Sequence, residues 1–407
     1  MEPNTQPLIE FDPYSTAFKT DPFPMLATMR RDVPIYQEID KDGKHRIWTI
    51  SRHADVEAIL RDHKRFVSNY RSLFPQEASD EPEPRSQVEN LISDNMLGKD
   101  GHDHARLRTL VSKAFTNRMV QTLRPRIQAF ADELLDQVVE QNEMDLVDAF
   151  ALPLPIMVIL EMLGIPVTDR DRVRAWSQAL IDPAGQAQEE DLIQELLTYL
   201  GELFTTRRRA PQDDVISAMV QAEESGDRLS ESELYSMVLL LIIAGHETTV
   251  KLIATGTLTL LQHPDQLARL HTDPALINSA IEELLRYCGP TDLAKSRFAT
   301  EDVEIGGHLI RRGDRVRLLI NSANRDEVRF NAADTFDITR QHNRHLGFGL
   351  GIHFCLGAPL ARQEAEIAIT TLLGRLPNLQ LAVPIGEVEW DLHSFVYGVK
   401  HLPVAWG

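Results

Sequence analysis

The amino-acid sequence predicts a mainly α-helical fold with a small β region, and three observations support this prediction. Apolar residues recur at three- and four-residue spacing through most of residues 104–262, which is typical of amphipathic helices. After Pro290 the pattern changes to alternation broken by glycine, which is typical of strands and turns. No linker-like stretch separates the two parts, so we expect residues 1–407 to form a single domain.

Composition and charge exclude several classes of function. The net charge of −19 argues against a nucleic-acid partner, because phosphate binding needs a basic surface. Two cysteines exclude a disulfide framework and fit a reducing compartment. The N-terminal segment is neither a signal peptide nor an anchor. The longest clean apolar run, residues 237–244, is far shorter than the roughly 20 residues of a membrane span. We therefore expect a soluble, cytoplasmic protein without a membrane span.

The segment before residue 104 is predicted to contain a hairpin, a short helix and a loop. Apolar and aromatic residues flank the turn pair Asp42-Gly43, which favours a β-hairpin over 34–51. A short helix is expected at 54–61. Residues 67–101 show no periodicity and include the charged, proline-rich stretch PQEASDEPEPRS, so we expect an irregular surface loop.

A long run of helices is predicted next. Its most informative member opens at Ser230, which has capping-box spacing to Glu233. The pattern continues to about Gln262 and is apolar all round in its middle, so this helix should cross the interior. The other predicted helices are 103–116, 118–141, 150–164, 169–181, 189–209, 264–271, 274–289 and 358–376, with a flexible connection at 182–188, strands and turns over 302–321 and a β-rich tail ending at Trp406.

One loop, HLGFGLGIHFCLGAP at 345–359, places Cys355 at the start of the last helix. Glycines at 347, 349 and 351 permit positive φ and close approach to another object, and a helix N-terminus favours a thiolate. The loop does not match the dinucleotide-binding motif G-x-G-x-x-G, because its glycines have the spacing G-x-G-x-G. A zinc site from His353 and Cys355 lacks the paired-cysteine spacing. Two alternatives stay open: a buried structural cysteine, and a metal site formed by the histidine groups GHDH at 101–104 and HNRH at 342–345.

The motif AGHETT, residues 244–249, interrupts the apolar helix with polar groups. Thr249 stands where a zinc-protease helix needs its second histidine, so that motif is absent. Burying Glu247 without a partner would be costly, and a threonine can bond back to an upstream carbonyl. The motif is either a satisfied polar cluster or a groove with a proton-delivering pair, Glu247 and Thr248.

Three weaker signals involve charged residues. Glu283 and Arg286 in EELLR are three apart and can pair on one helix face. His104 and Arg108 in HARLR are four apart and could bind an anion from one side. Arg297 is an isolated cation at the edge of a predicted strand. Each of these alone is usually an ordinary surface charge.

Together and in this order, these motifs resemble the cytochrome P450 family of haem-thiolate monooxygenases. Residues Phe348, Gly349, Gly351, His353, Cys355 and Gly357 fit its haem-binding signature F-x-x-G-x-[HR]-x-C-x-G. AGHETT resembles the oxygen-activating groove and EELLR the E-x-x-R pair, which Arg340 is expected to join. The resemblance implies the P450 fold, with haem b between the long central helix and the cysteine loop.

The resemblance also implies roles for these residues. Cys355 is the expected proximal iron ligand, a catalytic and metal-binding role, and Phe348 is expected to shield its sulfur. Glu247 and Thr248 are expected to handle protons during oxygen activation. The expected propionate ligands are His104, Arg108, Arg297 and His353, and the expected structural residues are Glu283, Arg286 and Arg340. Further expected haem contacts are Gly349, Gly357, Ala244, Met96 and Leu97. Met96 and Leu97 lie shortly before the segment DGHDH, where bacterial members of the family often have DPPxH.

The implied reaction is hydroxylation or epoxidation of an apolar small molecule with O2 and two electrons. The electrons would come from NAD(P)H through a reductase and a ferredoxin bound on the proximal face. The alternatives are a peroxide-driven hydroxylase and a haem sensor or carrier, and the Glu247–Thr248 pair argues against both. The expected basic docking patch comprises Lys113, Arg118, Arg344 and Arg362.

The expected substrate pocket is mostly apolar, which implies a hydrophobic substrate. Macrolides, steroids, terpenoids and fatty acids all fit this description, and secondary metabolism is the expected context. Asp292 could face the pocket, although a solvated loop position is the simpler expectation. Besides the segments 67–97 and 170–195, the expected pocket residues are Ile243, Ala244, Thr291, Leu293, Ala294, Phe395 and Val396.

Overall fold

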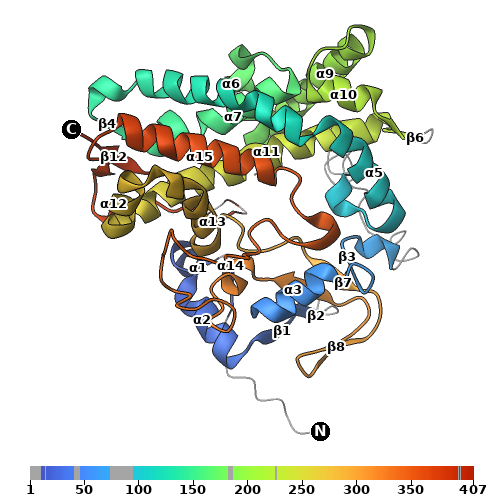
Figure 1. Cartoon of the computed structure of the whole chain (residues 1–407). Helices are drawn as coiled ribbons and strands as arrows, with labels where there is room; N and C mark the ends of the chain where they lie inside the picture. Colours follow the sequence, from blue (N-terminus) through green and yellow to red (C-terminus); the bar gives the residue numbers. More distant parts are fainter. Residues whose placement is uncertain are drawn as a thin grey trace.

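The computed structural model describes residues 11–407 except 14, 41–45, 74–94, 182–186, 225–226, 393 and 395. Figure 1 shows a large helical part above a smaller part built from strands and the N-terminal helices. The cysteine loop lies where the two parts meet. The predicted turn at Asp42-Gly43 lies outside the described residues, as do residues 182–186 of the connection predicted at 182–188. The last two residues of that connection are instead helical, since α9 begins at Ala187.

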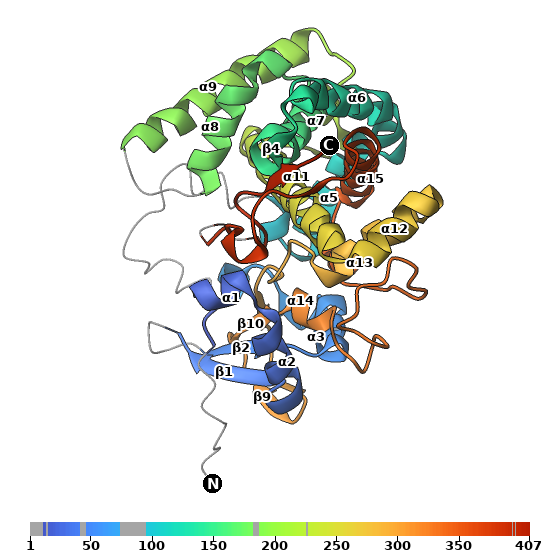
Figure 2. The same cartoon turned by 90° about the vertical axis from the view of Figure 1, so that its left-hand side faces the viewer.

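The predicted helices are confirmed, with small shifts at their ends. The segment predicted as one helix over 150–164 begins instead as a π-helical stretch, Val147–Ala151, before α7. Figure 2 shows α8 and α9 projecting side by side from the helical part. The helices are α1 (Thr16–Thr20), α2 (Phe23–Asp32), α3 (His53–Arg61), α5 (Gly101–Ala114), α6 (Asn117–Asp136), α7 (Pro153–Leu163), α8 (Arg170–Ile181), α9 (Ala187–Arg209), α10 (Val215–Gln221), α11 (Glu231–Gln262), α12 (Pro264–Thr272), α13 (Ile277–Tyr287), α14 (Ile320–Ala323) and α15 (Ala358–Arg375).

The central helix α11 begins where the sequence places it. The Ser230 hydroxyl accepts from the Glu233 amide at 3.2 Å, and the Glu233 carboxylate accepts from the Ser230 amide at 2.8 Å. This reciprocal cap satisfies two of the amides that a helix start leaves unpaired. Among the described helices α11 alone is long and apolar enough to cross a membrane, but 67% of its most apolar window is buried inside the protein. It is therefore a core helix.

Among the described residues, the largest sheet has five strands in the order β1-β2-β10-β7-β3. The predicted hairpin is confirmed as an antiparallel pair in which Ile35 faces Ile50. Strand β10 then pairs in parallel with β2 and antiparallel with β7, so distant segments join the hairpin in one sheet. The strands of this sheet are β1 (Ile35–Ile39), β2 (Arg46–Ile50), β3 (Phe66–Val67), β7 (Arg297–Ala299) and β10 (Arg315–Leu318). Two separate pairs are β5 (Glu223–Glu224) with β6 (Asp227–Arg228), and β8 (Val303–Ile305) with β9 (His308–Ile310).

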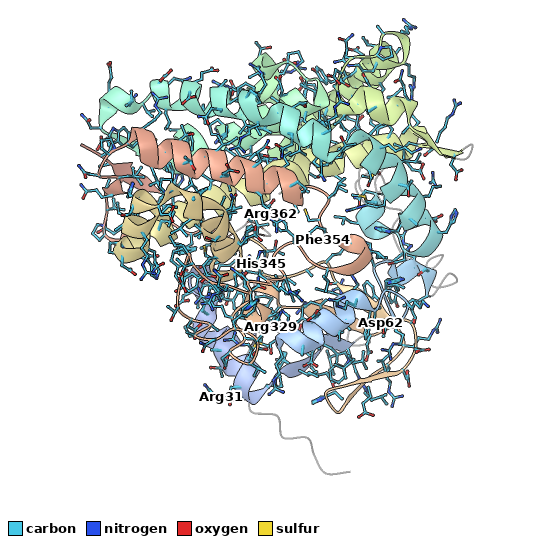
Figure 3. The ribbon with its side chains drawn as sticks, in the orientation of Figure 1. Arg31, Asp62, Arg329, His345, Phe354 and Arg362 are labelled. Carbon is cyan, nitrogen blue, oxygen red and sulfur yellow. The ribbon has the colours of Figure 1, made fainter. Side chains whose placement is uncertain are left out.

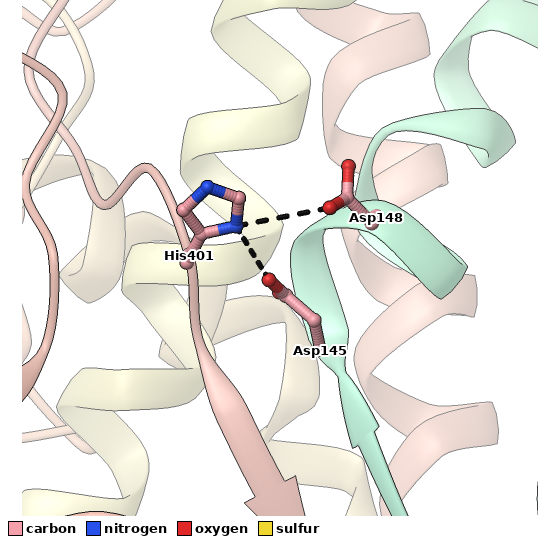
Figure 4. A group of neighbouring side chains, drawn as sticks. All are labelled: Asp145, Asp148 and His401. Atoms are coloured by element: carbon pink, nitrogen blue, oxygen red, sulfur yellow. Dashed lines mark hydrogen bonds and ion pairs between the residues drawn. The ribbon is translucent and has the colours of Figure 1, made fainter.

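The C-terminal tail joins a second, three-stranded sheet in the order β11-β12-β4, built from Gln380–Leu381, Pro403–Ala405 and Glu143–Asp145. Figure 4 shows the contact beside it: His401 Nδ1 lies 2.6 Å from Asp145 and 3.7 Å from Asp148. Asp145 also accepts from the Leu402 amide at 3.1 Å. These contacts fasten the tail to the segment that leads into α7.

Candidate active site

A cavity of about 310 Å³ lies between α11 and the cysteine loop. Three segments far apart in the sequence form most of its wall: α11, the strand-edge segment 290–297 and the loop 347–357. The first turns of α15 add Leu360, Ala361 and Glu364, and α5 adds Arg108. Its surface is largely apolar. The predicted site residues that line it are Met96, Leu97, Arg108, Ala244, Thr248, Thr291, Ala294, Arg297, Phe348, Gly349, His353, Cys355 and Gly357, joined by apolar residues such as Ile159, Met162, Leu240 and Leu241.

Cys355 faces this cavity just before α15. Its amide donates to the Phe348 carbonyl at 2.9 Å, which closes the loop around the sulfur. Burial raises the pKa of the Cys355 thiol, while the backbone amides of Gly357 and Ala358 and the charge of Arg108 oppose that rise. The start of α15 therefore provides the amide contacts to sulfur that are expected of a loop that holds a thiolate ligand. Burial raises the pKa of the thiol by more than these contacts lower it.

The glycines of the loop have different roles. Gly349 and Gly351 have positive φ angles of 67° and 74°, whereas Gly347 does not. A Cβ on Gly351 would lie 2.6 Å from the Leu60 carbonyl oxygen, so this glycine makes room for the end of α3 rather than for a bound group. A Cβ on Gly349 would meet only the His353 carbonyl within 4 Å, at 3.9 Å.

Basic groups gather at one end of the cavity. Burial lowers the pKa values of Arg108, Arg297 and His353. Lys295 also lines the cavity, and desolvation followed by the charge of Arg297 lowers its pKa to about 8. The carboxylate nearest to them is that of Asp100, 3.7 Å from His353 Nε2. This crowding of like charges is relieved by an anion, because each of these groups gains from a negative neighbour.

The cavity fits a haem on these observations. His353 Nδ1 is buried and has no hydrogen-bond partner among the described residues. Two arginines, a lysine and this imidazole can pair with two carboxylates, while the apolar walls and the Cys355 thiol suit a flat hydrophobic ring with a soft metal.

His104 lies behind the basic cluster rather than in the cavity wall. Its ring is 4.3 Å from that of His353, centroid to centroid, and edge-on to it. Burial, then the charges of His353 and Arg108, lower the pKa of His104 to about 4, so the ring is neutral at physiological pH. His104 therefore contacts the predicted propionate ligand His353 but does not itself line the cavity.

On the opposite wall, Thr248 faces the cavity from α11. Its hydroxyl donates to the Ala244 carbonyl at 3.1 Å, the upstream contact expected of a threonine within a helix. Glu247 is the preceding residue but does not line the cavity. Its Oε1 accepts from the Ser394 hydroxyl at 3.2 Å instead.

Several predicted pocket residues lie elsewhere. Ile243 packs against the helical core, Leu293 forms an isolated β-bridge with Leu319, and Val396 is buried, and none of the three lines the cavity. Phe395 lies outside the described residues. Asp292 is neither in the cavity nor solvated: it is 4% exposed, accepts from Asn321 at 2.6 Å, and burial raises its pKa to about 6.

The predicted structural trio forms one buried network. Glu283 and Arg286 are each 0% exposed and make two 2.8 Å hydrogen bonds with each other. Arg340 Nε lies 3.0–3.1 Å from both Glu283 oxygens. Arg286 also donates to the carbonyls of Asn324 and Ala333, at 2.9 and 2.7 Å. The network therefore ties α13 to the segment leading into the cysteine loop.

Sequence reasoning missed two ionisable residues of the cavity wall, Lys295 and Glu364. Lys295 is two residues before Arg297, so the strand period of two could have placed both on one side. Glu364 is 1% exposed, its Oε2 has no hydrogen-bond partner among the described residues, and burial raises its pKa well above the usual value. No pattern in the sequence distinguishes this acid from a solvated residue of an amphipathic helix.

Comparisons with known proteins agree with this site. The sequence model of the family described as "Cytochrome P450" matches residues 171–379. Polyketide biosynthesis cytochrome P450 PksS from Bacillus subtilis (strain 168) is 42% identical over 97% of this chain and 98% of its own length. The solved structure of PksS aligns with a TM-score of 0.90, 41% identity and coverage of 98% of this chain and 100% of the other.

A second solved structure agrees equally well. The myxobacterial cytochrome P450 CYP267B1, in complex with myristic acid, has a TM-score of 0.87 and 41% identity, and the match covers 97% of this chain and 98% of the other. Identity above 40% across nearly the whole of both chains, together with the thiol, the basic cluster and the buried Glu283 network, shows that this chain belongs to the cytochrome P450 family.

Proposed function

We propose that this protein is a monooxygenase in which residues 1–407 form one catalytic domain that oxidises an apolar small molecule with O2 and two electrons. The observation that carries the proposal is one cavity that presents a cysteine thiol, a basic cluster and an alcohol-bearing helix wall. Membership of the family establishes P450-type oxygenation with a haem-thiolate cofactor. The buried position of α11 supports a soluble enzyme, and we propose that it acts in the cytoplasm.

In this proposal each group has a distinct task. The Cys355 sulfur would hold the iron, and Arg108, Lys295, Arg297 and His353 would hold the two propionates. The bound haem supplies the oxygen activation. The Thr248 hydroxyl would face the reacting groups in the cavity. Glu247, the preceding residue, would supply protons to it although Glu247 does not line the cavity. Apolar walls exclude water from the reacting carbon.

Replacing Thr248 by alanine tests this division of tasks. We expect product formation to fall by up to about 10²-fold, with the lost electrons appearing as hydrogen peroxide, because proton delivery loses its cavity-side group. Thr257→Ala is the matched control: its hydroxyl bonds back to the Ile253 carbonyl at 2.8 Å in the same helix, away from the cavity. Equal coupling in the two variants would place proton delivery elsewhere.

The substrate is proposed to be a long, linear, apolar polyketide or fatty-acyl chain. The cavity wall beyond the basic cluster consists mostly of apolar side chains, among them Ile159, Met162 and Leu240. The relatives described above include a polyketide-biosynthesis enzyme and one bound to myristic acid. We expect the spin-state change on substrate binding to be strongest with such chains in a screen that also contains steroids, terpenoids and macrolides. A response limited to steroids would reject this class.

Electrons are proposed to come from NAD(P)H through a reductase and a ferredoxin bound beside the start of α15. Phe354, labelled in Figure 3, directly precedes the cysteine. Its exposed fraction is 40%. Gln363 in α15 donates to the Val120 carbonyl at 2.8 Å, which brings the exposed Arg118 near this start. Arg344 is exposed in the segment before the loop. Arg362, labelled in the same figure, is paired with Glu282 at 2.5 and 2.9 Å, so the predicted patch carries less free charge there.

Charge reversal tests this docking surface. We expect Arg118→Glu combined with Arg344→Glu to lower the rate of reduction by a ferredoxin about tenfold or more at low salt, and to flatten its salt dependence, because electrostatic attraction speeds encounter. Arg209→Glu makes the same kind of change at the exposed end of α9 and should have little effect. Unchanged rates in the double variant would move the docking site elsewhere.

A further inference from the structure

The described residues of the segment 391–399 contact α11 through Lys251 and through Glu247, which does not line the cavity. Two side chains of α11, one turn apart, hold it there. Lys251 donates to the Asp391 carboxylate at 2.7 Å and to the Val399 carbonyl at 3.0 Å. Glu247 accepts from the Ser394 hydroxyl at 3.2 Å. The catalytic helix and this loop therefore share a buried polar contact.

Ser394 is fixed at all three of its polar atoms. Its amide donates to Asp391 Oδ1 at 3.1 Å. Its carbonyl accepts from the buried Lys19 ammonium of α1 at 3.1 Å. Its hydroxyl, besides donating to Glu247, accepts from the Val396 amide at 3.1 Å. Since the side chain is only 7% exposed, few other orientations are open to it.

This arrangement fixes the direction of the hydroxyl proton. A serine hydroxyl has one proton and two lone pairs. The Val396 amide occupies a lone pair, so the proton is free to point at Glu247 Oε1. The Ser394 hydroxyl therefore donates to the Glu247 carboxyl group from a held position, across a long hydrogen bond of 3.2 Å.

The other side of Glu247 offers no comparable donor among the described residues. His246 Nε2 lies 3.9 Å from Glu247 Oε2. However, His246 Nδ1 lies 2.7 Å from the Ile242 carbonyl, which places the ring proton on Nδ1. Burial lowers the pKa of His246, so the ring stays neutral. Nε2 then carries a lone pair, which suits the 3.3 Å contact with the Ser177 hydroxyl and cannot donate to Glu247.

We propose that Ser394 is a positioning residue for the distal acid: its hydroxyl holds the Glu247 carboxylate in the orientation from which Glu247 serves Thr248. The inference rests on the proposed role of Glu247. Lys19 and Asp391 act indirectly, because they hydrogen-bond to the backbone of Ser394 and so hold the serine in place. Ser394 thus contributes to proton delivery although it does not line the cavity.

The test compares Ser394→Ala with Ser394→Thr in the haem-loaded enzyme. We expect Ser394→Ala to lower the fraction of electrons recovered in product about tenfold and to raise peroxide release, as loss of a hydrogen bond to a charged group does. Ser394→Thr keeps the hydroxyl and should restore most of the coupling. A spectroscopic readout independent of turnover is the infrared carboxylate band of Glu247, assigned by difference from Glu247→Gln, which should shift in Ser394→Ala alone.

Two further variants separate the possible outcomes. Ser217→Ala is the control, because Ser217 is also buried (2% exposed) and its hydroxyl accepts a hydrogen bond from the Gln212 amide at 2.9 Å, not from a residue of the AGHETT motif. This variant should recover the same fraction of electrons in product as the parent enzyme. If Glu247→Gln uncouples the enzyme while Ser394→Ala does not, the inference is wrong and the proposed role of Glu247 stands. If Glu247→Gln itself couples normally, the proposed role fails. Should Ser394→Ala not fold, Ser394→Cys, similar in size and a weak donor, provides the same comparison.

Discussion

Replacing Cys355 by serine is expected to abolish the long-wavelength absorption band of the reduced, carbon-monoxide-bound protein, together with all substrate oxidation. The band reports a thiolate on the haem iron, and a serine oxygen is a poor substitute for a soft sulfur ligand. Of the chain's two cysteines, only Cys355 lines the cavity. Absorption spectra of the purified variant, reduced and exposed to carbon monoxide, measure the outcome directly.

Cys288→Ser is the matched control. Cys288 is buried, and its sulfur accepts from the Thr259 hydroxyl at 3.2 Å in the core between α11 and α13. Burial raises the pKa of this thiol to about 11, so it is a neutral core group. The control should keep the band and the activity. A Cys355→Ser protein that kept the band would contradict the ligand assignment.

Removing Glu283 is expected to have the largest effect on stability. Glu283→Ala leaves Arg286, which is 0% exposed, and Arg340 without their shared carboxylate. Breaking a buried ion pair in this way costs about 3–5 kcal/mol, which is a large part of the roughly 5–15 kcal/mol that stabilises a typical protein. We expect little folded, haem-loaded protein, measured by yield and by urea unfolding.

An exposed ion pair provides the comparison. Glu161 pairs with Arg126 at 2.9 Å, with 30% and 51% of the two side chains exposed. Glu161→Ala should cost less than about 1 kcal/mol, because solvent screens such pairs. Glu283→Gln keeps the size of the side chain and should be intermediate. Equal unfolding midpoints for Glu283→Ala and Glu161→Ala would show that the buried network does not support the fold.

Features encoded locally could be predicted from the sequence. The capping box at Ser230 and Glu233 is readable because both partners lie within one turn. The i,i+3 pair of Glu283 and Arg286 is readable for the same reason. Whether such a pair is buried is decided by distant segments, and for this pair the family resemblance supplied that information.

The remainder depends on contacts between residues far apart in the sequence. Glu247 and Ser394 are separated by 147 positions, so the partner of the acid could not be read from its own helix. Lys19 reaches the same turn across 375 positions. His104 shares a helix face with Arg108, as expected, but the fold places His353 between it and the cavity. Periodicity identifies a face, and only tertiary packing decides what that face meets.

Gly351 bears on how this enzyme can be engineered. Its φ of 74° disfavours any side chain, and a Cβ at this position would lie 2.6 Å from the Leu60 carbonyl oxygen, which leaves no space for one. A mutant library aimed at new substrates therefore gains nothing by varying this position, although it lies four residues from the cysteine. Diversity is better placed at Ile159, Met162 and Leu240, whose side chains line the cavity from other helices.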